Sequence, residues 1–100
     1  MIHILVTLNA RDPESSKLRD YEAKVLPLVR RCGGRVLSAF TPQRNGDQGD
    51  PDEIHLLEFP SRDHLARYRG EVDLLELAAE REAAILSMRI DISEEIHLAE

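Results

Sequence analysis

The chain lacks tryptophan, and two tyrosines and two phenylalanines are its only aromatic residues among 100. Its core must therefore consist mostly of leucine, isoleucine, valine and alanine side chains, which have no polar or reactive groups. A chain of this length forms one modest core, so we assign residues 1–100 to a single domain. Domains of this size often gain stability by oligomerising.

Cysteine is almost absent. Cys32 is the only one, so no disulfide can form within the chain, which suits a reducing compartment. The first residues, Met1 to Val6, lack the charged start and the small-residue cleavage site of a signal peptide. No apolar run approaches the roughly 20 residues that span a bilayer. The sequence thus predicts a cytoplasmic protein without a membrane partner.

Positive charge is scarce, because 13 lysines and arginines face 19 acidic residues and leave a net charge of -6. This balance argues against nucleic-acid binding, which needs a basic surface. Eleven of the 13 basic residues are arginine. That excess is compatible with a local site for an anion, and a biased genome composition explains it equally well.

The motifs of common cofactor and catalytic chemistry are missing. The sequence contains no phosphate loop, no dinucleotide fingerprint, no nucleophile elbow and no paired-carboxylate motif. The four histidines, His3, His55, His64 and His97, include no pair with the close spacing of metal ligands, and Cys32 stands apart from them. The sequence therefore predicts neither a cofactor nor a metal site.

The first third of the chain predicts a strand followed by a helix. Residues 2–8 alternate with a period of two, as a strand does. Asp12 is a good N-cap, and Pro13 suits the first helical position. Apolar residues then recur every three or four positions as far as Cys32, which predicts an amphipathic helix of about five turns. Gly33-Gly34 ends this helix.

The middle of the chain predicts two further strands joined by a loop. Residues 35–41 form the second strand, with Val36 and Phe40 on one side. Residues 42–52 are a polar loop, longer than a tight hairpin needs. Residues 53–59 form the third strand.

The last third predicts helical segments and a final strand. Ser61 caps the first segment, and Asp73 with Glu76 three residues later forms a capping box for the next. The predicted elements are a short helix over residues 61–69, a helix over residues 74–86, a strand over residues 87–93 and a tail over residues 94–100. The order β-α-β-β-α-β predicts an α+β, ferredoxin-like fold with a four-stranded antiparallel sheet and both helices on one face.

The sheet face without helices is not polar. Its apolar residues include Leu5, one set from the second strand, and either Leu57 and Phe59 or Ile54 and Leu56. Exposing so much apolar surface is costly, so we expect a homodimer in which two sheets pack face to face with two-fold symmetry. The alternative is a monomer whose tail covers this face.

Four short motifs follow one another through the middle of the chain. They are Tyr-Glu-x-Lys-Val-x-Pro at residues 21–27, Gly-Gly-Arg-hydrophobic-Leu at residues 33–37, Glu-Phe-Pro-Ser at residues 58–61, and Tyr68. Over roughly residues 12–70 they resemble the DUF1330 family, whose function is unassigned. The resemblance implies the dimeric α/β barrel fold. The wider superfamily includes cofactor-independent monooxygenases, EthD-like and NIPSNAP-like proteins, and chlorite-dismutase-type haem enzymes. After Tyr68 the sequence departs from the Ser-Pro-Glu-Tyr-like segment common in the family.

Three residues are candidates for catalysis: His3, His55 and Tyr21. We expect the first and third strands to be adjacent and parallel, so the two histidines would lie near each other in the dimer interior if both pointed there. Such imidazoles could act as general bases or bind a carboxylate or enolate, although a strand histidine is more often structural. Tyr21 lies on the apolar stripe of its helix, where core packing competes with catalysis. Glu22 and Lys24 are expected to be solvated.

Three further residues, Arg35, Glu58 and Phe59, are candidates for ligand binding. Arg35 follows the helix end and, with Arg30-Arg31, could form an anion site. Glu58 would need a partner such as an arginine if it pointed inward. Cys32 is expected to be buried and inert.

The sequence thus predicts a homodimer of unassigned function that binds a small apolar or acidic ligand. One alternative is a cofactor-independent monooxygenase or isomerase acting on a small enolisable or aromatic compound, with His3, His55 and Tyr21 as its polar groups. Another is a purely structural dimer with a filled interior.

Overall fold

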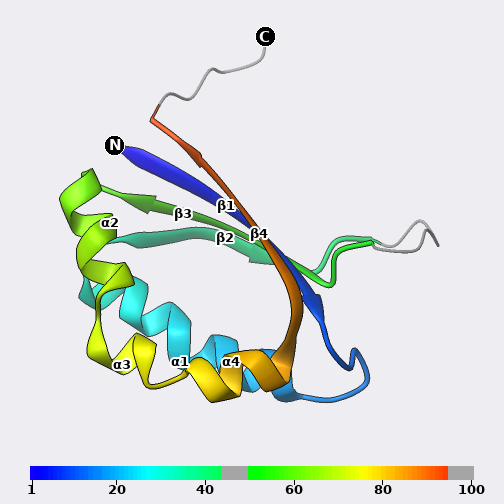
Figure 1. Ribbon diagram of the computed structural model, residues 1–100. Helices are drawn as coiled ribbons and strands as arrows, with labels where there is room; N and C mark the ends of the chain where they lie inside the picture. The colour runs from blue at the N-terminus through cyan, green and yellow to red at the C-terminus, as the bar shows by residue number, and fades with distance from the viewer. Residues whose placement is uncertain (44–49, 95–100) are drawn as a thin grey trace, which may run out of the picture.

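The computed structural model describes residues 1–43 and 50–94. The elements in chain order are β1 (Ile2–Ala10), α1 (Lys17–Arg31), β2 (Arg35–Phe40), β3 (Glu53–Phe59), α2 (Arg62–Arg69), α3 (Val72–Leu75), α4 (Ala78–Ala84) and β4 (Ile85–Ser93). The predicted ferredoxin-like α+β order is confirmed (Figure 1). Part of the predicted loop over residues 42–52, and the predicted tail beyond residue 94, lie outside the described residues. No helix of the described part is long and apolar enough to cross a membrane.

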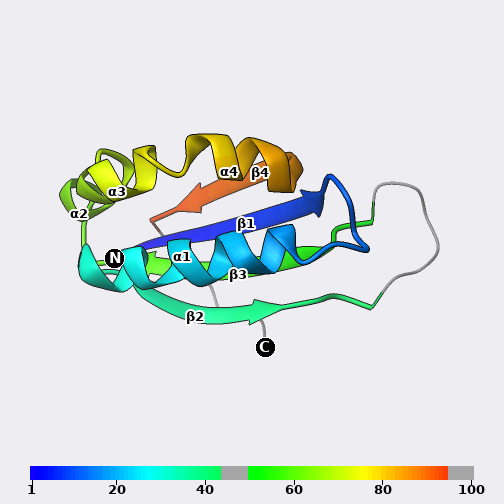
Figure 2. The ribbon, with the colours of Figure 1, turned by 90° about the horizontal axis from the view of Figure 1, so that it is seen from below.

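The four strands form one sheet in the order β2-β3-β1-β4, and every neighbouring pair is antiparallel. The helices form a layer over one face of this sheet (Figures 1 and 2). The expectation that the first and third strands are parallel is wrong. The crossover through α1 makes β1 and β2 run in the same direction, and β3, which returns from β2, lies between them in the opposite direction.

The strand periodicity decides which side chains the helices cover. The buried sheet residues of the covered face include Ile2, Ile4, Leu8, Leu57 and Phe59. Leu5 lies between two of them on β1 and is 40% exposed. On β3, Ile54 and Leu56 pair with Thr7 and Leu5, so they lie on the open face. The alternative left open by the sequence is therefore settled, with Leu57 and Phe59 in the core.

Helix α1 begins at Lys17, later than the predicted start. Asp12 Oδ1 accepts a hydrogen bond from the Glu14 backbone N–H, and the Asp12 carbonyl accepts one from the Ser15 backbone. The expected N-cap thus organises a separate turn, because a short acidic side chain bonds equally well to nearby non-helical backbone. The predicted end of the helix is confirmed, since Gly33 has a φ of 89° and provides the left-handed residue after the last turn.

The second helical region is divided into three pieces. Ser61 caps α2 as predicted, because its hydroxyl oxygen accepts a hydrogen bond from the His64 backbone N–H at 3.3 Å. The predicted capping box does not form, since Asp73 lies inside the single turn of α3 and Glu76 follows its end. The predicted helix over residues 74–86 therefore starts as α3 and continues as α4, and β4 begins at Ile85.

Strand β2 contains an irregularity that exchanges its two faces. Its pairing with β3 passes over Leu37, so Val36 pairs with Leu57 on the covered face and Phe40 pairs with Ile54 on the open face. The prediction that Val36 and Phe40 share one side is wrong, because one extra residue in a bulge reverses the alternation. Phe40 is consequently 46% exposed.

Candidate functional site

A mostly apolar pocket lies between the sheet and the helix layer. Its volume is about 100 Å³, and its walls come from β1, β3 and β4 on the sheet side and from α1 and α2 on the helix side. The polar residues among its lining are Tyr21, Glu22, His55, Tyr68 and Arg69. This pocket belongs to one chain and lies on the covered face of the sheet. It is therefore distinct from the interior between two sheets in which the sequence placed a ligand.

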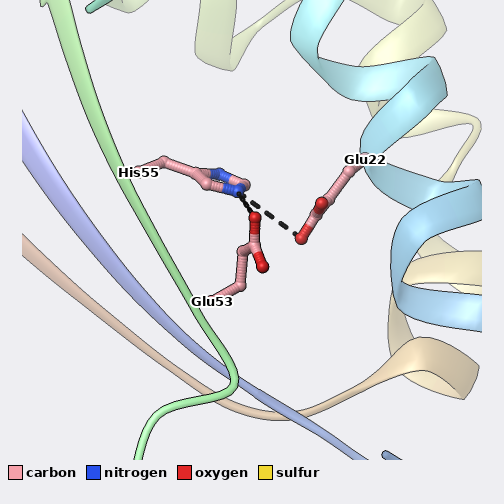
Figure 3. A group of neighbouring side chains, drawn as sticks. All are labelled: Glu22, Glu53 and His55. Carbon is pink, nitrogen blue, oxygen red and sulfur yellow. Dashed lines mark ion pairs between the residues drawn. The ribbon is translucent and has the colours of Figure 1, made fainter. Parts of the chain in front are cut away.

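Two carboxylates and one imidazole converge beside the pocket (Figure 3). Glu53 and His55 are two residues apart on β3 and so share a face, while Glu22 reaches them from α1. His55 Nε2 lies 3.4 Å from Glu22 Oε1 and 3.5 Å from Glu53 Oε1. The exposed fractions of the side chains are only 5% for His55, 12% for Glu22 and 11% for Glu53.

The hydrogen bonds of this cluster are incomplete. Within the described residues, His55 Nε2 and Glu22 Oε1 are buried and have no hydrogen-bond partner. Glu53 is held differently, because its Oε2 accepts a hydrogen bond of 2.9 Å from the Thr41 hydroxyl, which itself accepts one from Arg19. A buried polar atom without a hydrogen-bond partner is costly, so this wall of the pocket is the candidate position for a ligand or an ion.

Two tyrosines, Tyr21 and Tyr68, are among the residues that line the pocket. Burial raises the pKa of Tyr21 above its usual value, and the charge of Arg81 offsets part of that rise. Burial also raises the pKa of Tyr68 to about 12, with smaller contributions from Tyr21 and Cys32. Both phenols are therefore neutral near pH 7, where they can donate hydrogen bonds but cannot act as bases. The catalytic role of Tyr21 stays a prediction.

Three of the predicted site residues meet on the open face of the sheet. His3 stands opposite Glu58 in the pairing of β1 with β3, and Arg35 stands opposite Glu58 on the other side. His3 Nε2 lies 3.3 Å from Glu58 Oε2, and Arg35 Nη1 lies 3.3 Å from Glu58 Oε1. The sequence predicted that Glu58 would need an arginine partner if it pointed inward, and Arg35 is such a partner. The described helices cover the other face of the sheet.

His3 and His55 do not lie together. In the antiparallel pairing, His3 is opposite Glu58 and His55 is opposite Val6, three positions further along β1. An odd separation places the two imidazoles on opposite faces of the sheet. The expected histidine pair is therefore wrong, because it assumed parallel strands and a third strand of the other phase.

The predicted ligand-binding residues are absent from the pocket lining. Arg35 and Glu58 belong to the open face, and Phe59 is fully buried in the core, where its ring centroid lies 5.4 Å from that of Tyr68. A ligand role for these residues stays a prediction and would concern the open face.

Sequence reasoning missed two members of the buried cluster. Glu22 was expected to be solvated, yet its side chain is 12% exposed and points toward β3. Glu53 was read only as the start of a strand. The available signal is the phase of that strand, since Glu53 and His55 alternate in step with Leu57 and Phe59. Once those two apolar residues are assigned to the core, the acidic residue and the histidine must follow them.

Comparison with known proteins gives the family and the fold. The family model described as "Domain of unknown function (DUF1330)" matches residues 2–93. No curated protein is similar enough to the sequence to count as a relative.

Solved structures of similar fold include several bacterial proteins. A protein of unknown function from Rhodopseudomonas palustris superposes with a TM-score of 0.77 at 20% identity, over 97% of this chain and 83% of that chain. SnoaB, a cofactor-independent oxygenase from Streptomyces nogalater, superposes with a TM-score of 0.69 at 10% identity, over 97% of this chain and 94% of that chain. A dabb family protein with a ferredoxin-like fold from Mesorhizobium loti superposes with a TM-score of 0.67 at 14% identity, over 96% of this chain and 97% of that chain. At such low identity the likeness shows the ferredoxin-like fold alone and leaves the activity open.

Proposed function

We propose that this chain, which belongs to the DUF1330 family, binds a small and mostly apolar molecule in the pocket between its sheet and its helices. The supporting observation is that two buried atoms, Glu22 Oε1 and His55 Nε2, have no hydrogen-bond partner within the described residues, in a lining that is otherwise largely aliphatic. Ligand sites typically combine an apolar wall with a few polar groups that fix the orientation of the ligand.

The size and charge of the pocket define the ligand further. A dry protein cavity of about 150 Å³ accepts benzene, so a pocket of about 100 Å³ suits at most one aromatic ring or an aliphatic group of similar size. The carboxylates of Glu22 and Glu53 disfavour an anion at the polar end. Of the apolar and acidic ligands that the sequence left open, we therefore retain an apolar body that carries a neutral hydrogen-bond donor such as a hydroxyl group.

A second candidate is an enzyme that acts on such a molecule without a cofactor. An imidazole beside two carboxylates can accept a proton from an enolisable or phenolic compound, and the neutral Tyr21 hydroxyl could donate a hydrogen bond to it. SnoaB shows that a cofactor-independent oxygenase can have this fold. In this version His55 would be the base, and His3, on the opposite face, would take no part in the chemistry.

We also infer that the protein is a homodimer that packs its open sheet faces together. Leu5 and Phe40 support this inference, since both lie on that face and are 40% and 46% exposed. The pocket itself favours ligand binding over a purely structural dimer. A cytoplasmic location remains part of the proposal, and the free thiol of Cys32 is in keeping with it.

The test is a titration of ¹⁵N-labelled protein with phenol and, separately, with benzoate. Phenol offers one ring and a neutral donor, so it should shift the amide signals of pocket residues such as Val25 and Leu57 in a saturable way. Benzoate has the same ring with a negative charge and should not, because Glu22 and Glu53 repel it.

A filled pocket provides the control. Val25→Phe places a ring from α1 into the cavity and should abolish the phenol shifts, whereas Ala23→Phe on the exposed side of α1 should leave them unchanged. The proposal fails if phenol produces no saturable shifts at pocket residues, or if folded Val25→Phe binds phenol as the unmodified protein does.

A further inference from the structure

Glu22, Glu53 and His55 form a buried cluster whose contacts are longer than direct hydrogen bonds. His55 Nε2 lies 3.4 and 3.5 Å from its two carboxylate oxygens. These separations exceed the roughly 2.7–3.2 Å of an N–H···O hydrogen bond. Figure 3 shows the imidazole nitrogen directed toward the space between the two carboxylates, with one oxygen of each turned toward it.

The same separations fit the ligand shell of a small metal ion. Around a tetrahedral ion with bonds of about 2.0–2.1 Å, neighbouring ligand atoms are about 3.3–3.4 Å apart. The ligand atoms of Glu22, Glu53 and His55 all lie within 4.8 Å of one another. One ion could therefore contact all three after small side-chain movements.

Burial and charge provide independent support. The His55 side chain is only 5% exposed, and its Nε2 and Glu22 Oε1 have no hydrogen-bond partner within the described residues. Two buried carboxylates carry two negative charges, which one protonated imidazole would only half balance. A divalent cation balances both charges and bonds to both orphaned atoms.

The surrounding residues orient the carboxylate of Glu53. The Thr41 hydroxyl donates a hydrogen bond of 2.9 Å to Glu53 Oε2, and Arg19 Nη2 donates one of 3.3 Å to the same hydroxyl. These bonds fix the outer oxygen and leave Oε1 directed toward His55. Outer hydrogen bonds of this kind position the ligands in established metal sites.

We propose that Glu22, Glu53 and His55 bind a divalent transition-metal ion, with one imidazole nitrogen and two carboxylate oxygens as its ligands. This donor set suits Zn²⁺ or Mn²⁺ better than Ca²⁺ or Mg²⁺, which prefer oxygen alone. Three protein ligands leave one position of a tetrahedral ion open. Because Glu22 and His55 line the pocket, water or a donor atom of a bound molecule could reach that position from the pocket.

The sequence did not predict this site, because its ligands are far apart along the chain. Glu53 follows Glu22 by 31 positions, and His55 follows it by 33. Only the packing of α1 over β3 brings them together. The inference stands without the proposed organic ligand, because a metal ion can be titrated alone.

Calorimetric titration of the metal-free protein with Zn²⁺ tests the proposal. We expect one Zn²⁺ per chain at a site that His55→Ala and Glu22→Gln each weaken by at least about tenfold. The matched control is His3→Ala, because His3 also lies 3.3 Å from a glutamate on β3 but faces the other side of the sheet. That variant should bind Zn²⁺ within about twofold of the unmodified protein, since Glu58, the carboxylate beside His3, is already paired with Arg35.

A second measurement does not depend on the folding of the variants. Substoichiometric Mn²⁺ added to the unmodified ¹⁵N-labelled protein should broaden the amide signals of residues 22, 53 and 55 before those of residue 3. The proposal is overturned if the unmodified protein binds neither ion, if broadening begins elsewhere, or if folded Glu22→Gln retains the full Zn²⁺ affinity. Those outcomes would leave a protonated imidazole between the carboxylates as the explanation of the cluster.

Discussion

Two adjacent glycines that follow α1 are required for different reasons. Gly33 has a φ of 89°, a left-handed conformation that side chains disfavour. For Gly34 the constraint is space, because a Cβ would lie 2.7 Å from the Phe59 ring and 2.9 Å from Val29 Cγ1. Phe59 and Val29 are both 0% exposed, so neither can move aside into solvent.

Gly34→Ala should therefore lower the free energy of unfolding by about 1–3 kcal/mol, the usual cost of overpacking a core. Gly70→Ala is the control, since the nearest atom to its Cβ would be 3.5 Å away. We expect that variant to change the unfolding free energy by less than about 0.5 kcal/mol. Urea denaturation of both variants at one protein concentration measures the difference. Equal stabilities would mean that the Phe59 ring has room to move.

At the residue scale, the sequence identified His55 as a candidate but could not say which face of the sheet it lies on. On β3, Ile54 and Leu56 form as convincing an apolar face as Leu57 and Phe59, so alternation alone cannot say which set is inside. The choice depends on packing against α1, which is 22 or more positions away in sequence. Glu22 is a second example, because its neighbours on the helix give no indication in the sequence that its charge is buried.

At the scale of elements, the structure contrasts two serines that precede helices. Ser61 closes the start of α2, because its hydroxyl oxygen accepts the His64 N–H at 3.3 Å and lies 2.7 Å from His64 Nδ1. Ser16 precedes α1 but makes no capping bond, and its hydroxyl instead donates to Asp20 Oδ2 at 3.0 Å.

Ser61→Ala should thus lower the unfolding free energy by about 1 kcal/mol, because the N-terminal turn of α2 loses its cap. Ser16→Ala should cost only a few tenths of that, since it removes one exposed hydrogen bond. Thermal or urea unfolding followed by circular dichroism compares them. A larger loss from Ser16→Ala would contradict this account of the two helix starts.

Element order was more predictable than element boundaries. Turn residues such as Gly33-Gly34 and the cap at Ser61 act within a few positions, so local chemistry reveals them in the sequence. The late start of α1 depends on a turn at Asp12 that competes with helix formation, and the bulge after Val36 depends on pairing with β3. The bulge was missed because the strand pairing that decides it is distant in sequence, and the start of α1 was missed because a local turn at Asp12 competes with the helix.

At the scale of the whole molecule, the open face of the sheet has two parts. Leu5, Phe40, Ile54 and Leu56 form its apolar part, and the first two are 40% and 46% exposed. The ion pairs of Glu58 with His3 and Arg35 form a polar part at the end where β1 begins. A two-fold axis through this face would bring the apolar parts of two chains together, because such an interface applies the same patch to itself.

Leu5→Glu tests this arrangement directly. In a face-to-face dimer the new carboxylate would be buried without a partner, so the variant should be monomeric at concentrations where the unmodified protein is a dimer of twice 11.4 kDa. Val72→Glu is the control, because Val72 is an equally apolar residue, 62% exposed, on α3 in the helix layer. It should remain dimeric. Analytical ultracentrifugation over a range of concentrations gives both masses. The arrangement is contradicted if the unmodified protein sediments as a monomer, or if the Leu5→Glu variant remains a dimer. Either result would show that the open face does not form the contact between two chains.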